Sequence, residues 1–311
     1  MTARLILPAD APRDQWLAAR RGGVTASEIA VILGISPYDS PFNLYYRKRG
    51  ELTDDYDNTA MSLGRHLEPW IADQWAADHP EWTVGTGGLY ASEERSWQMA
   101  TPDRLLYDGL CRCPDFADVA DDHADSLLEI KSSGTYDGWG DDGTDVIPAY
   151  YRAQVLWQLD VMGLAEAHVT CFFLSTRNRR DYVVAYDADD VQLMRKAAHA
   201  FMDAVEAGTP PDIDWHPATE AALKALNPKV DDDETEIAAA LADRYATACQ
   251  RFALWKRIKK QVENELRDAM GPHKRATAGG LTVATRSIYT VPEHTRPESH
   301  MDKLTPPRSK K

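Results

Sequence analysis

The chain contains little cysteine. Four of its 311 residues are cysteines, too few for the disulfide framework of a small secreted domain. Cys111 and Cys113 stand two apart, but a zinc or iron–sulfur site needs two more soft ligands nearby. We therefore interpret them as ordinary residues of a strand or turn. Cys171 falls in an apolar run typical of a buried strand, and the set as a whole predicts a reducing compartment.

Long apolar runs are also missing. No stretch of the sequence approaches the roughly 18 apolar residues of a membrane span. The apolar run near the N-terminus, residues 5–7, is too short for a signal peptide. We therefore expect a soluble cytoplasmic protein. Its 311 residues allow one large domain or two modest domains with ample core.

Positive charge is in short supply. The 35 lysines and arginines stand against 49 aspartates and glutamates, for a net charge of −14. A protein that coats duplex DNA nonspecifically needs cations to neutralise the phosphates, so this balance argues against that class. It does not exclude an enzyme that acts on phosphate, because the local field at a site matters more than the total charge.

Two carboxylates and a lysine have a spacing that suits a metal site. Asp103 follows a Thr-Pro pair, and Glu129-x-Lys131 ends an apolar run further along the chain. Residues two apart in a strand point to the same face, so Glu129 and Lys131 can reach one site. Such a group can bind Mg²⁺ and activate a water for attack on phosphate. The spacing resembles that of the PD-(D/E)xK nucleases.

Two further polar residues lie on helices expected beside these strands. Glu68 falls in a helix predicted over residues 61–75, next to its apolar stripe. A carboxylate close to a core is costly unless it has a partner, which favours a metal role. Gln154 falls in a helix predicted over residues 149–162, directly after the Glu129 strand.

Together these segments resemble the YqaJ-type viral recombinase exonucleases, relatives of phage lambda exonuclease in the PD-(D/E)xK superfamily. The resemblance runs from about residue 16 to about residue 211, and its motifs occur in family order. They are Thr25-Ala-Ser27-Glu28-Ile29 with Gly34-x-Ser36-Pro37-Tyr38, Gly64-x-x-x-Glu68-Pro69, Thr101-Pro102-Asp103-Arg104, Glu129-Ile130-Lys131 and Pro148-x-x-Tyr151-x-x-Gln154.

The resemblance implies a catalytic metal site. Asp103 and Glu129 would bind Mg²⁺, as one or two ions, with help from the backbone carbonyl of Ile130, and Mn²⁺ could substitute. Lys131 would orient or activate the attacking water. Glu68, as a further candidate metal ligand, and Gln154 would complete the catalytic set.

The resemblance also implies a binding site for the 5′-phosphate of a DNA end. Arg20 and Ser27 match the positions that hold this phosphate, and Thr101 is a further candidate. Shortly after Lys131, where a family member can carry a basic residue, this chain has a segment that ends in Asp137. The alternative is that Arg20 is an ordinary surface residue of the first helix.

The activity implied is a metal-dependent DNA exonuclease that resects linear duplex ends, 5′→3′, for phage-type homologous recombination. Its partners would be double-stranded DNA ends and a single-strand annealing recombinase. A homo-oligomer is also an option, because some relatives form rings. The location would be the host cytoplasm for a phage-encoded protein. Two alternatives stay open: a RecB- or Cas4-like nuclease, which often needs four cysteines for an iron–sulfur cluster, and a non-catalytic scaffold that binds DNA ends.

The expected fold class is α/β (α+β), with a mixed sheet flanked by helices as in restriction endonucleases. Residues 1–215 would form the exonuclease domain. Residues 216–311 would form an accessory region with a long helix over 232–270, a small hairpin over 281–291 and a disordered tail from residue 292. Strands are predicted over 84–90, 97–101, 104–107, 127–131, 167–174 and 182–186. Other helices are predicted over 16–21, 25–33, 41–49 and 191–207.

Basic residues gather in two parts of the sequence. We predict that both face DNA, since clustered cations are the usual electrostatic footprint of nucleic-acid binding. They are Arg13, Arg20, Arg21, Arg47, Lys48 and Arg49 in the first part, and Arg177, Arg179 and Arg180 in the second.

Overall fold

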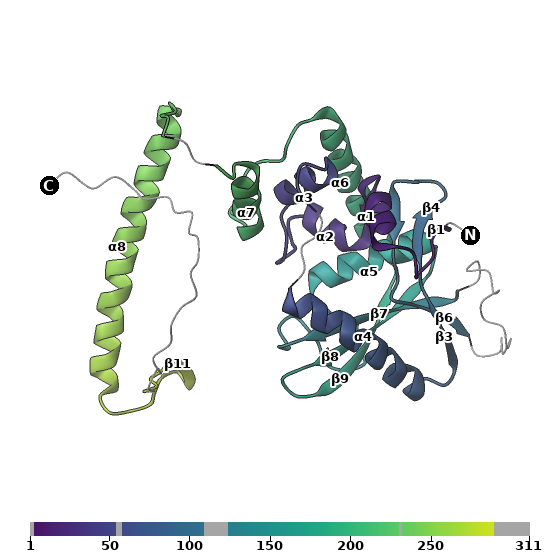
Figure 1. The fold of residues 1–311 in the computed structure, drawn as a ribbon. Coiled ribbons are helices and arrows are strands. Elements are labelled where there is room, and N and C mark those ends of the chain that lie inside the picture. Colours follow the sequence, from purple (N-terminus) through teal and green to yellow (C-terminus); the bar gives the residue numbers. More distant parts are fainter. Residues whose placement is uncertain (1–2, 54–57, 109–123, 230–231, 289–311) are drawn as a thin grey trace. The chain divides into compact units, whose positions relative to one another are not determined.

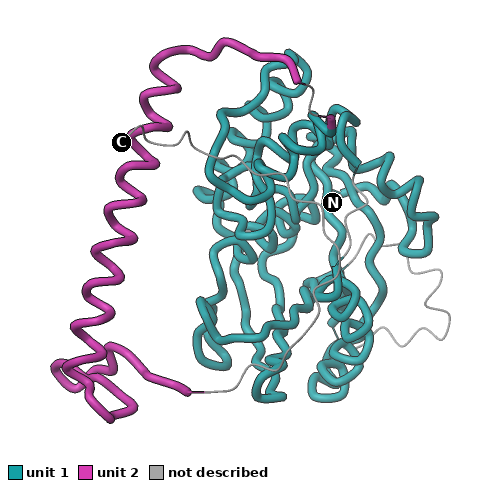
Figure 2. The backbone as a smooth tube through the Cα atoms, turned by 60° about the vertical axis from the view of Figure 1, so that its left-hand side comes forward, with its two compact units in different colours: residues 1–228 teal, residues 229–311 magenta. Residues whose placement is uncertain are grey.

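The computed structural model describes residues 3–53, 58–108, 124–229 and 232–288 (Figure 1). The chain divides into two compact units, residues 1–228 and 229–311 (Figure 2). The first unit extends past residue 215, the predicted end of the exonuclease domain. The predictions for Cys111, Cys113 and the tail from residue 292 lie outside the described residues.

A five-stranded mixed sheet carries the residues of the predicted site. Its strands lie in the order β3-β6-β7-β8-β9. Only β7 and β8 pair in parallel; the other neighbours are antiparallel. Helix α5 (Ala149–Met162) connects the parallel pair, because parallel neighbours need a long crossover. The strands are β3 (Trp82–Thr86), β6 (Arg104–Asp108), β7 (Ser126–Ser133), β8 (Glu166–Phe173) and β9 (Asn178–Ala185).

A second sheet of four strands has the order β1-β4-β5-β2. The single strand predicted over residues 84–90 is wrong, because β3 ends at Thr86 and β4 belongs to this other sheet. The strand is interrupted after Thr86. At Gly87 the backbone comes so close to Pro102 that a Cβ would lie 2.3 Å from the Pro102 carbonyl oxygen. Strand β1 has no counterpart in the sequence prediction. The strands are β1 (Ala3–Leu7), β2 (Val24–Thr25), β4 (Leu89–Ser92) and β5 (Gln98–Ala100).

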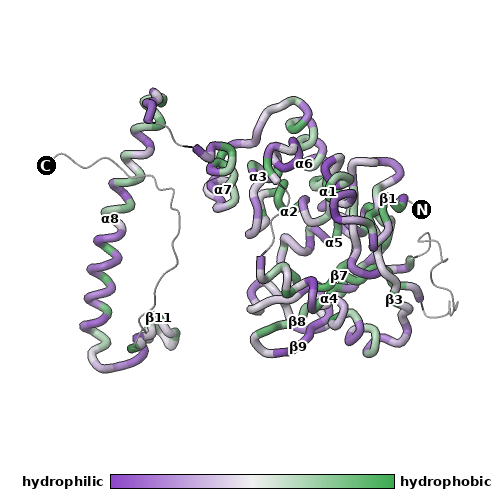
Figure 3. The backbone as a smooth tube through the Cα atoms, in the orientation of Figure 1, coloured by the Kyte–Doolittle hydropathy of each residue, from purple (hydrophilic) through white to green (hydrophobic). Residues whose placement is uncertain are grey.

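Two helices cover opposite faces of the five-stranded sheet. The alternation of β7 sends Leu127 into the core cluster that contains α5, whereas Leu128 and Ile130 pack in the cluster of helix α4 (Thr59–Asp78). Figure 3 shows apolar, green stretches along β7 and β8. Among the helices that the structure describes, none is long and apolar enough to cross a membrane.

The remaining helices of the first unit include α7 (Pro217–Leu226), which has no counterpart among the helices predicted from the sequence. Helix α7 starts with Pro217 in its first turn, and the Nδ1 of His216 accepts a hydrogen bond from the Ala218 amide at 3.0 Å, both ordinary features of a helix start. Its Thr219 hydroxyl donates to Ser40 at 2.8 Å. The helices are α1 (Arg13–Arg21), α2 (Ala26–Ile32), α3 (Pro41–Lys48), α6 (Ala188–Ala207) and α7 (Pro217–Leu226).

The second unit consists of helix α8 (Ala239–Met270) and a hairpin of β10 (Arg275–Ala278) and β11 (Leu281–Thr285). The predicted helix start at residue 232 is wrong. The acidic run before Ala239 stays outside the helix, since adjacent like charges repel and Thr235 and Ile237 are weak helix formers. The hairpin predicted over 281–291 lies too far along the chain. The observed hairpin turns at Gly279-Gly280, and both glycines have positive φ, as a two-residue hairpin turn prefers.

Candidate active site

Strand β7 presents Glu129 and Lys131 to helix α5. The Glu129 carboxylate is buried, with 1% of the residue exposed. The Lys131 ammonium donates a hydrogen bond to Oε1 of Glu129 and lies 4.9 Å from the centre of the Tyr151 ring on α5. The two-residue spacing therefore places a carboxylate and a cation side by side on one face of the sheet, as strand geometry requires.

Two glutamines of α5 complete the surroundings of the Glu129 carboxylate. The amide of Gln154 donates to Oε1. The amide of Gln158 donates to Oε2 at 2.8 Å and to the Thr101 carbonyl at 3.3 Å. Sequence reasoning missed Gln158, although it lies one helical turn after Gln154 and so on the same helix face. The pair holds both oxygens of Glu129 in a fixed orientation.

Asp103 joins the site from the loop between β5 and β6. The Ile130 amide donates to Oδ2 of Asp103 at 2.7 Å, so the two predicted metal-binding carboxylates reach the same part of β7. Burial raises the pKa of Asp103 well above its ordinary value, and the nearby charges of Glu129 and Glu68 raise it further. The charge of Lys131 and the hydrogen bond from the Ile130 amide lower the pKa of Asp103 and offset this rise only in part.

Glu68 reaches the cluster from α4, and it has a cationic partner. The Arg104 guanidinium donates to Oε1 of Glu68 at 2.8 Å and also to the backbone carbonyl of Asp103. Sequence reasoning gave Arg104 no role, although it directly follows Asp103 in the motif. Glu68 is therefore paired with a cation in this cluster, as Glu129 is with Lys131.

The donor set suits a hard divalent cation. Mg²⁺ is commonly bound by one or two carboxylates, with waters and substrate phosphate completing six oxygens. Asp103 and Glu129, with the Ile130 carbonyl, would supply such a set. Burial, and then the charges of Glu129 and Glu68, raise the pKa of Asp103, and a bound cation would favour its ionised form. Within the described residues, no group of three or more His, Cys, Asp or Glu side chains is arranged to hold a metal.

Lys131 is an ammonium ion in this environment. Burial alone would lower its pKa, but the charges of Glu129 and Asp103 outweigh burial and hold the pKa above its ordinary value. A lysine that keeps its proton cannot serve as a general base near neutral pH. It can orient a water and stabilise the negative charge that develops on a phosphate.

Removing one of these carboxylates should stabilise the metal-free protein. The folded state holds the Asp103 proton more tightly than the unfolded chain, so the contribution of Asp103 to stability falls as pH rises from about 3.9 through the raised folded pKa. At about pH 8 in EDTA, Asp103→Asn is expected to melt about 2–4 °C above the wild type, the shift of a gain near 1 kcal/mol. Differential scanning calorimetry measures this gain.

The pH and the metal supply the controls for this melting experiment. The gain should shrink near pH 4, and Mg²⁺ should raise the melting temperature of the wild type more than that of Asp103→Asn. Asp145→Asn, at an exposed aspartate, should leave the melting temperature unchanged. An Asp103→Asn protein that melts below the wild type in EDTA at about pH 8 would contradict the like-charge crowding.

The other predicted site, for a 5′-phosphate, is a small polar cluster where α1 meets α2. Arg20 donates from Nη2 to the hydroxyls of Thr25 and Ser27, each at 3.0 Å, and its guanidinium lies 4.5 Å from the centre of the Trp16 ring. The Arg20 side chain is only 21% exposed, whereas Ser27 is exposed. Arg20 is therefore held in one orientation and is not a free surface residue.

The two sites are joined through the four-stranded sheet. Thr25 pairs in parallel with Met99 of β5, and the chain continues from β5 through Thr101 to Asp103. The Trp157 indole of α5 donates to the carbonyls of Val24 at 3.3 Å and Met99 at 3.1 Å. The Thr101 carbonyl accepts a hydrogen bond from Gln158. Within the described part of the chain, no hydrogen bond joins Thr101 to Arg20 or Ser27.

The chain is similar to known proteins in sequence and in structure. Residues 15–165 match the model of the YqaJ-like viral recombinase domain. The chain is 23% identical over 288 residues to the uncharacterized protein YqaJ of Bacillus subtilis strain 168, a match covering 89% of this chain and 84% of that protein.

Two nucleases are among the solved structures to which the chain is similar. The LHK-Exo complex with dAMP is 21% identical, with a TM-score of 0.49 over 63% of this chain and 93% of that chain; a second structure of LHK-Exo is described as an alkaline exonuclease from Laribacter hongkongensis. A phage-related exonuclease from Haemophilus somnus is 10% identical, with a TM-score of 0.42 over 60% of this chain and 94% of that chain.

Proposed function

We propose that this chain, whose residues 15–165 match the model of the YqaJ-like viral recombinase domain, is a metal-dependent DNA exonuclease that resects linear duplex ends. The observation that supports the activity is the cluster of Asp103, Glu129 and Lys131, where two carboxylates and an ammonium ion meet. Such a group of side chains suits metal-assisted phosphodiester hydrolysis. Residues 1–215, within the first unit, would carry the catalysis, and the residues that follow would be accessory.

Mg²⁺ would be held by Asp103, Glu129 and the Ile130 carbonyl, as one or two ions, and Mn²⁺ could take its place. When bound, it would polarise the scissile phosphate and lower the pKa of a bound water. Gln154 and Gln158 fix the Glu129 carboxylate, so its oxygens need not reorganise when the substrate arrives. The Lys131 ammonium would orient the attacking water and offset negative charge on the phosphate, and Arg104 would hold Glu68 at the edge of the site.

Arg20 and Ser27 would receive the terminal 5′-phosphate. The Ser27 hydroxyl accepts from Arg20 and lies 3.3 Å from the Thr25 hydroxyl. With Thr25 as the donor of that second bond, the Ser27 proton would be available to a phosphate oxygen. A bound 5′-phosphate would fix how far the DNA end enters the site of Asp103 and Glu129. Such a contact would favour 5′→3′ resection. The single strand left behind would suit an annealing recombinase as the partner in phage-type homologous recombination.

Metal dependence on linear DNA tests the activity. Linear duplex and covalently closed circular duplex of the same sequence are incubated with the protein in Mg²⁺, Mn²⁺ or EDTA. We expect nucleotides to be released from the linear form in either metal, with no release in EDTA and no loss of the closed circle. Binding to the ends with no release in any metal would instead identify a non-catalytic end-binding scaffold.

Replacing Arg20 tests the end-recognition role. Wild-type protein should degrade 5′-phosphorylated ends faster than 5′-hydroxyl ends, by about tenfold, the worth of one charge-assisted hydrogen bond. Arg20→Ala should erase most of this preference and still degrade 5′-hydroxyl ends, because the metal site is untouched. Arg21→Ala, one residue along the same helix, is the control. Equal phosphate preference in wild type and Arg20→Ala would leave Arg20 without a role at the end.

A further inference from the structure

A buried lysine ties together the two helices that carry Arg20 and Ser27. The Lys48 ammonium donates three hydrogen bonds: to the carbonyls of Arg20 at 2.7 Å and Gly23 at 2.6 Å, and to Oε2 of Glu28 at 2.8 Å. Its side chain is 3% exposed. An ammonium group has three donors, so all of them are used inside the protein. Lys48, predicted to face DNA as part of the first basic cluster, is therefore not available to DNA.

Glu28 continues this connection into α2. Its Oε2 also accepts from the Thr25 amide at 2.8 Å and closes a capping box with Thr25 at the start of α2. Its Oε1 lies 3.8 Å from Nη2 of Arg20. The pKa of Glu28 lies below its ordinary value. Burial raises this pKa, but the charges of Lys48 and Arg20 and the hydrogen bonds to the carboxylate lower it by more. The carboxylate is thus ionised at neutral pH.

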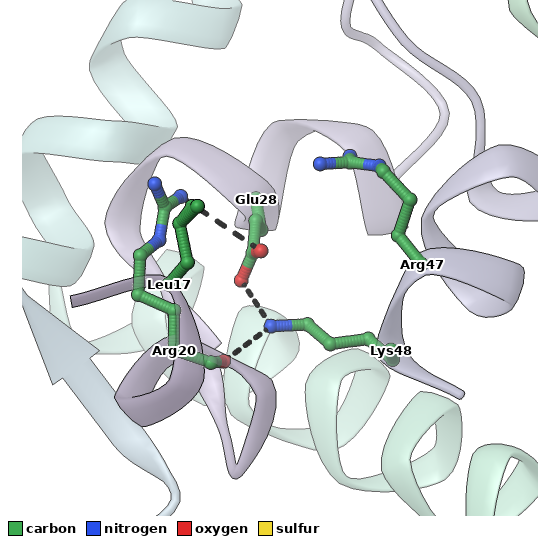
Figure 4. Close-up of a pocket in the computed structure, with 5 residues that line it drawn as sticks. All are labelled: Leu17, Arg20, Glu28, Arg47 and Lys48. Atoms are coloured by element: carbon green, nitrogen blue, oxygen red, sulfur yellow. Dashed lines mark hydrogen bonds and ion pairs between the residues drawn. The ribbon is translucent and has the colours of Figure 1, made fainter. Parts of the chain in front are cut away.

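Figure 4 shows these residues around a small cavity of about 40 Å³, lined by Leu17, Arg20, Glu28, Arg47 and Lys48. Such a volume has room for a few waters and not for a nucleotide. Lys48 and Arg20 point toward Glu28 from α3 and α1. The cavity is therefore not a substrate pocket, and its polar lining has a structural purpose.

We propose that Lys48 and Glu28 are positioning residues for the recognition of a DNA 5′-phosphate. Lys48 fixes the carbonyl end of α1, which carries Arg20, and Glu28 fixes the start of α2, which carries Ser27. The guanidinium and the hydroxyl that would touch the phosphate are thereby held 3.0 Å apart. This inference rests on the proposed end-binding role of Arg20 and Ser27, and goes beyond it by naming what sets their geometry.

Binding without cleavage tests this inference separately from the nuclease activity. Full-length protein is titrated in EDTA with fluorescent duplexes that differ only in a 5′-phosphate or a 5′-hydroxyl. Lys48→Met removes the three donors. The double variant Lys48→Met with Glu28→Gln also removes the unpaired buried charge, so that the protein can fold if the single variant does not. Calorimetric melting confirms the folded state of each protein.

The expected result is a phosphate preference of about tenfold in the wild type and of less than about twofold in the double variant. Affinity for 5′-hydroxyl ends should stay within about twofold. Arg195→Met, which loses its ion pair with Asp160, is the control for destabilisation alone and should keep the preference. A double variant that keeps the full preference, or a wild type that has none, would overturn the proposal.

These outcomes also separate the inference from the nuclease proposal. If the wild type prefers phosphate in EDTA, the double variant loses that preference, and neither releases nucleotide in Mg²⁺, the exonuclease is contradicted and the positioning role is supported. A folded double variant that loses the preference but still degrades 5′-hydroxyl ends in Mg²⁺ at the wild-type rate supports both. A parallel loss of affinity for both kinds of end contradicts the positioning role, because a merely structural defect has that effect.

Discussion

Asp103→Ala is expected to reduce nucleotide release from linear duplex by about a thousandfold or more. Metal-ion stabilisation of the reacting phosphate is worth several kcal/mol, and each 1.36 kcal/mol is a factor of ten in rate. Asp103 lies beside the Glu129 strand through its bond to the Ile130 amide, so its loss should remove or misplace the ion. Single-turnover digestion at saturating Mg²⁺ gives the rate.

Two further proteins make this result specific. Glu129→Ala should show a loss of the same order, because both carboxylates hold the same ion, and the double variant should lose little more than either single variant. Asp145→Ala, at an exposed aspartate, should cleave at the wild-type rate. Retention of near wild-type cleavage by either site variant at saturating Mg²⁺ would remove that residue from the site.

Lys131→Met is expected to slow cleavage by about a hundred- to thousandfold while DNA binding changes little, the usual cost of removing one donor aimed at developing charge. Because the pKa of Lys131 is raised and the residue stays charged, the charge itself should matter. Lys131→Arg should therefore be faster than Lys131→Met, yet slower than the wild type, since a guanidinium differs in shape from an ammonium.

Separate measurement of binding and turnover decides the role of Lys131. Anisotropy titration in EDTA gives the affinity, and single-turnover digestion gives the rate of the bound complex. The account requires the Lys131→Met defect to lie in the rate. A large loss of affinity with an unchanged rate would place Lys131 in DNA binding and not in catalysis.

The sequence carried enough information for the parts of the fold with regular periodicity. The β7 run and helix α5 lie where alternation and the spacing of apolar residues put them, and these two elements bring Glu129, Lys131 and Gln154 together. The mixed sheets flanked by helices, with the long helix α8, confirm the predicted fold class. Local patterns suffice here because each element buries one well-defined face.

What the sequence did not reveal depends on contacts between distant segments. Strand β1 exists because it pairs with β4, and the break at Gly87 is set by the close approach of Pro102. Neither partner is visible in a local window. The roles of Arg104 and Gln158 likewise come from neighbours in space, Glu68 and Glu129.

The basic clusters also depend on contacts that the sequence does not reveal. A run of cations suggests a surface for DNA, but Lys48 is buried and spends all three donors within the protein. In the second cluster, Arg179 pairs with Asp78 and Asp181. Charge counts along a sequence do not distinguish a solvated cation from one that holds two helices together; only the burial of the side chain does.

Release of a label from one end of a linear duplex tests the central claim most directly. Duplexes with a single label at the 5′-phosphorylated end or at the 3′ end of one strand are digested in Mg²⁺ by wild type and by Asp103→Ala. The account predicts that the wild type releases the 5′ label first, as mononucleotide, with the 3′ label following only after the strand is degraded, and that Asp103→Ala releases neither. Release of either label by Asp103→Ala at the wild-type rate would contradict it.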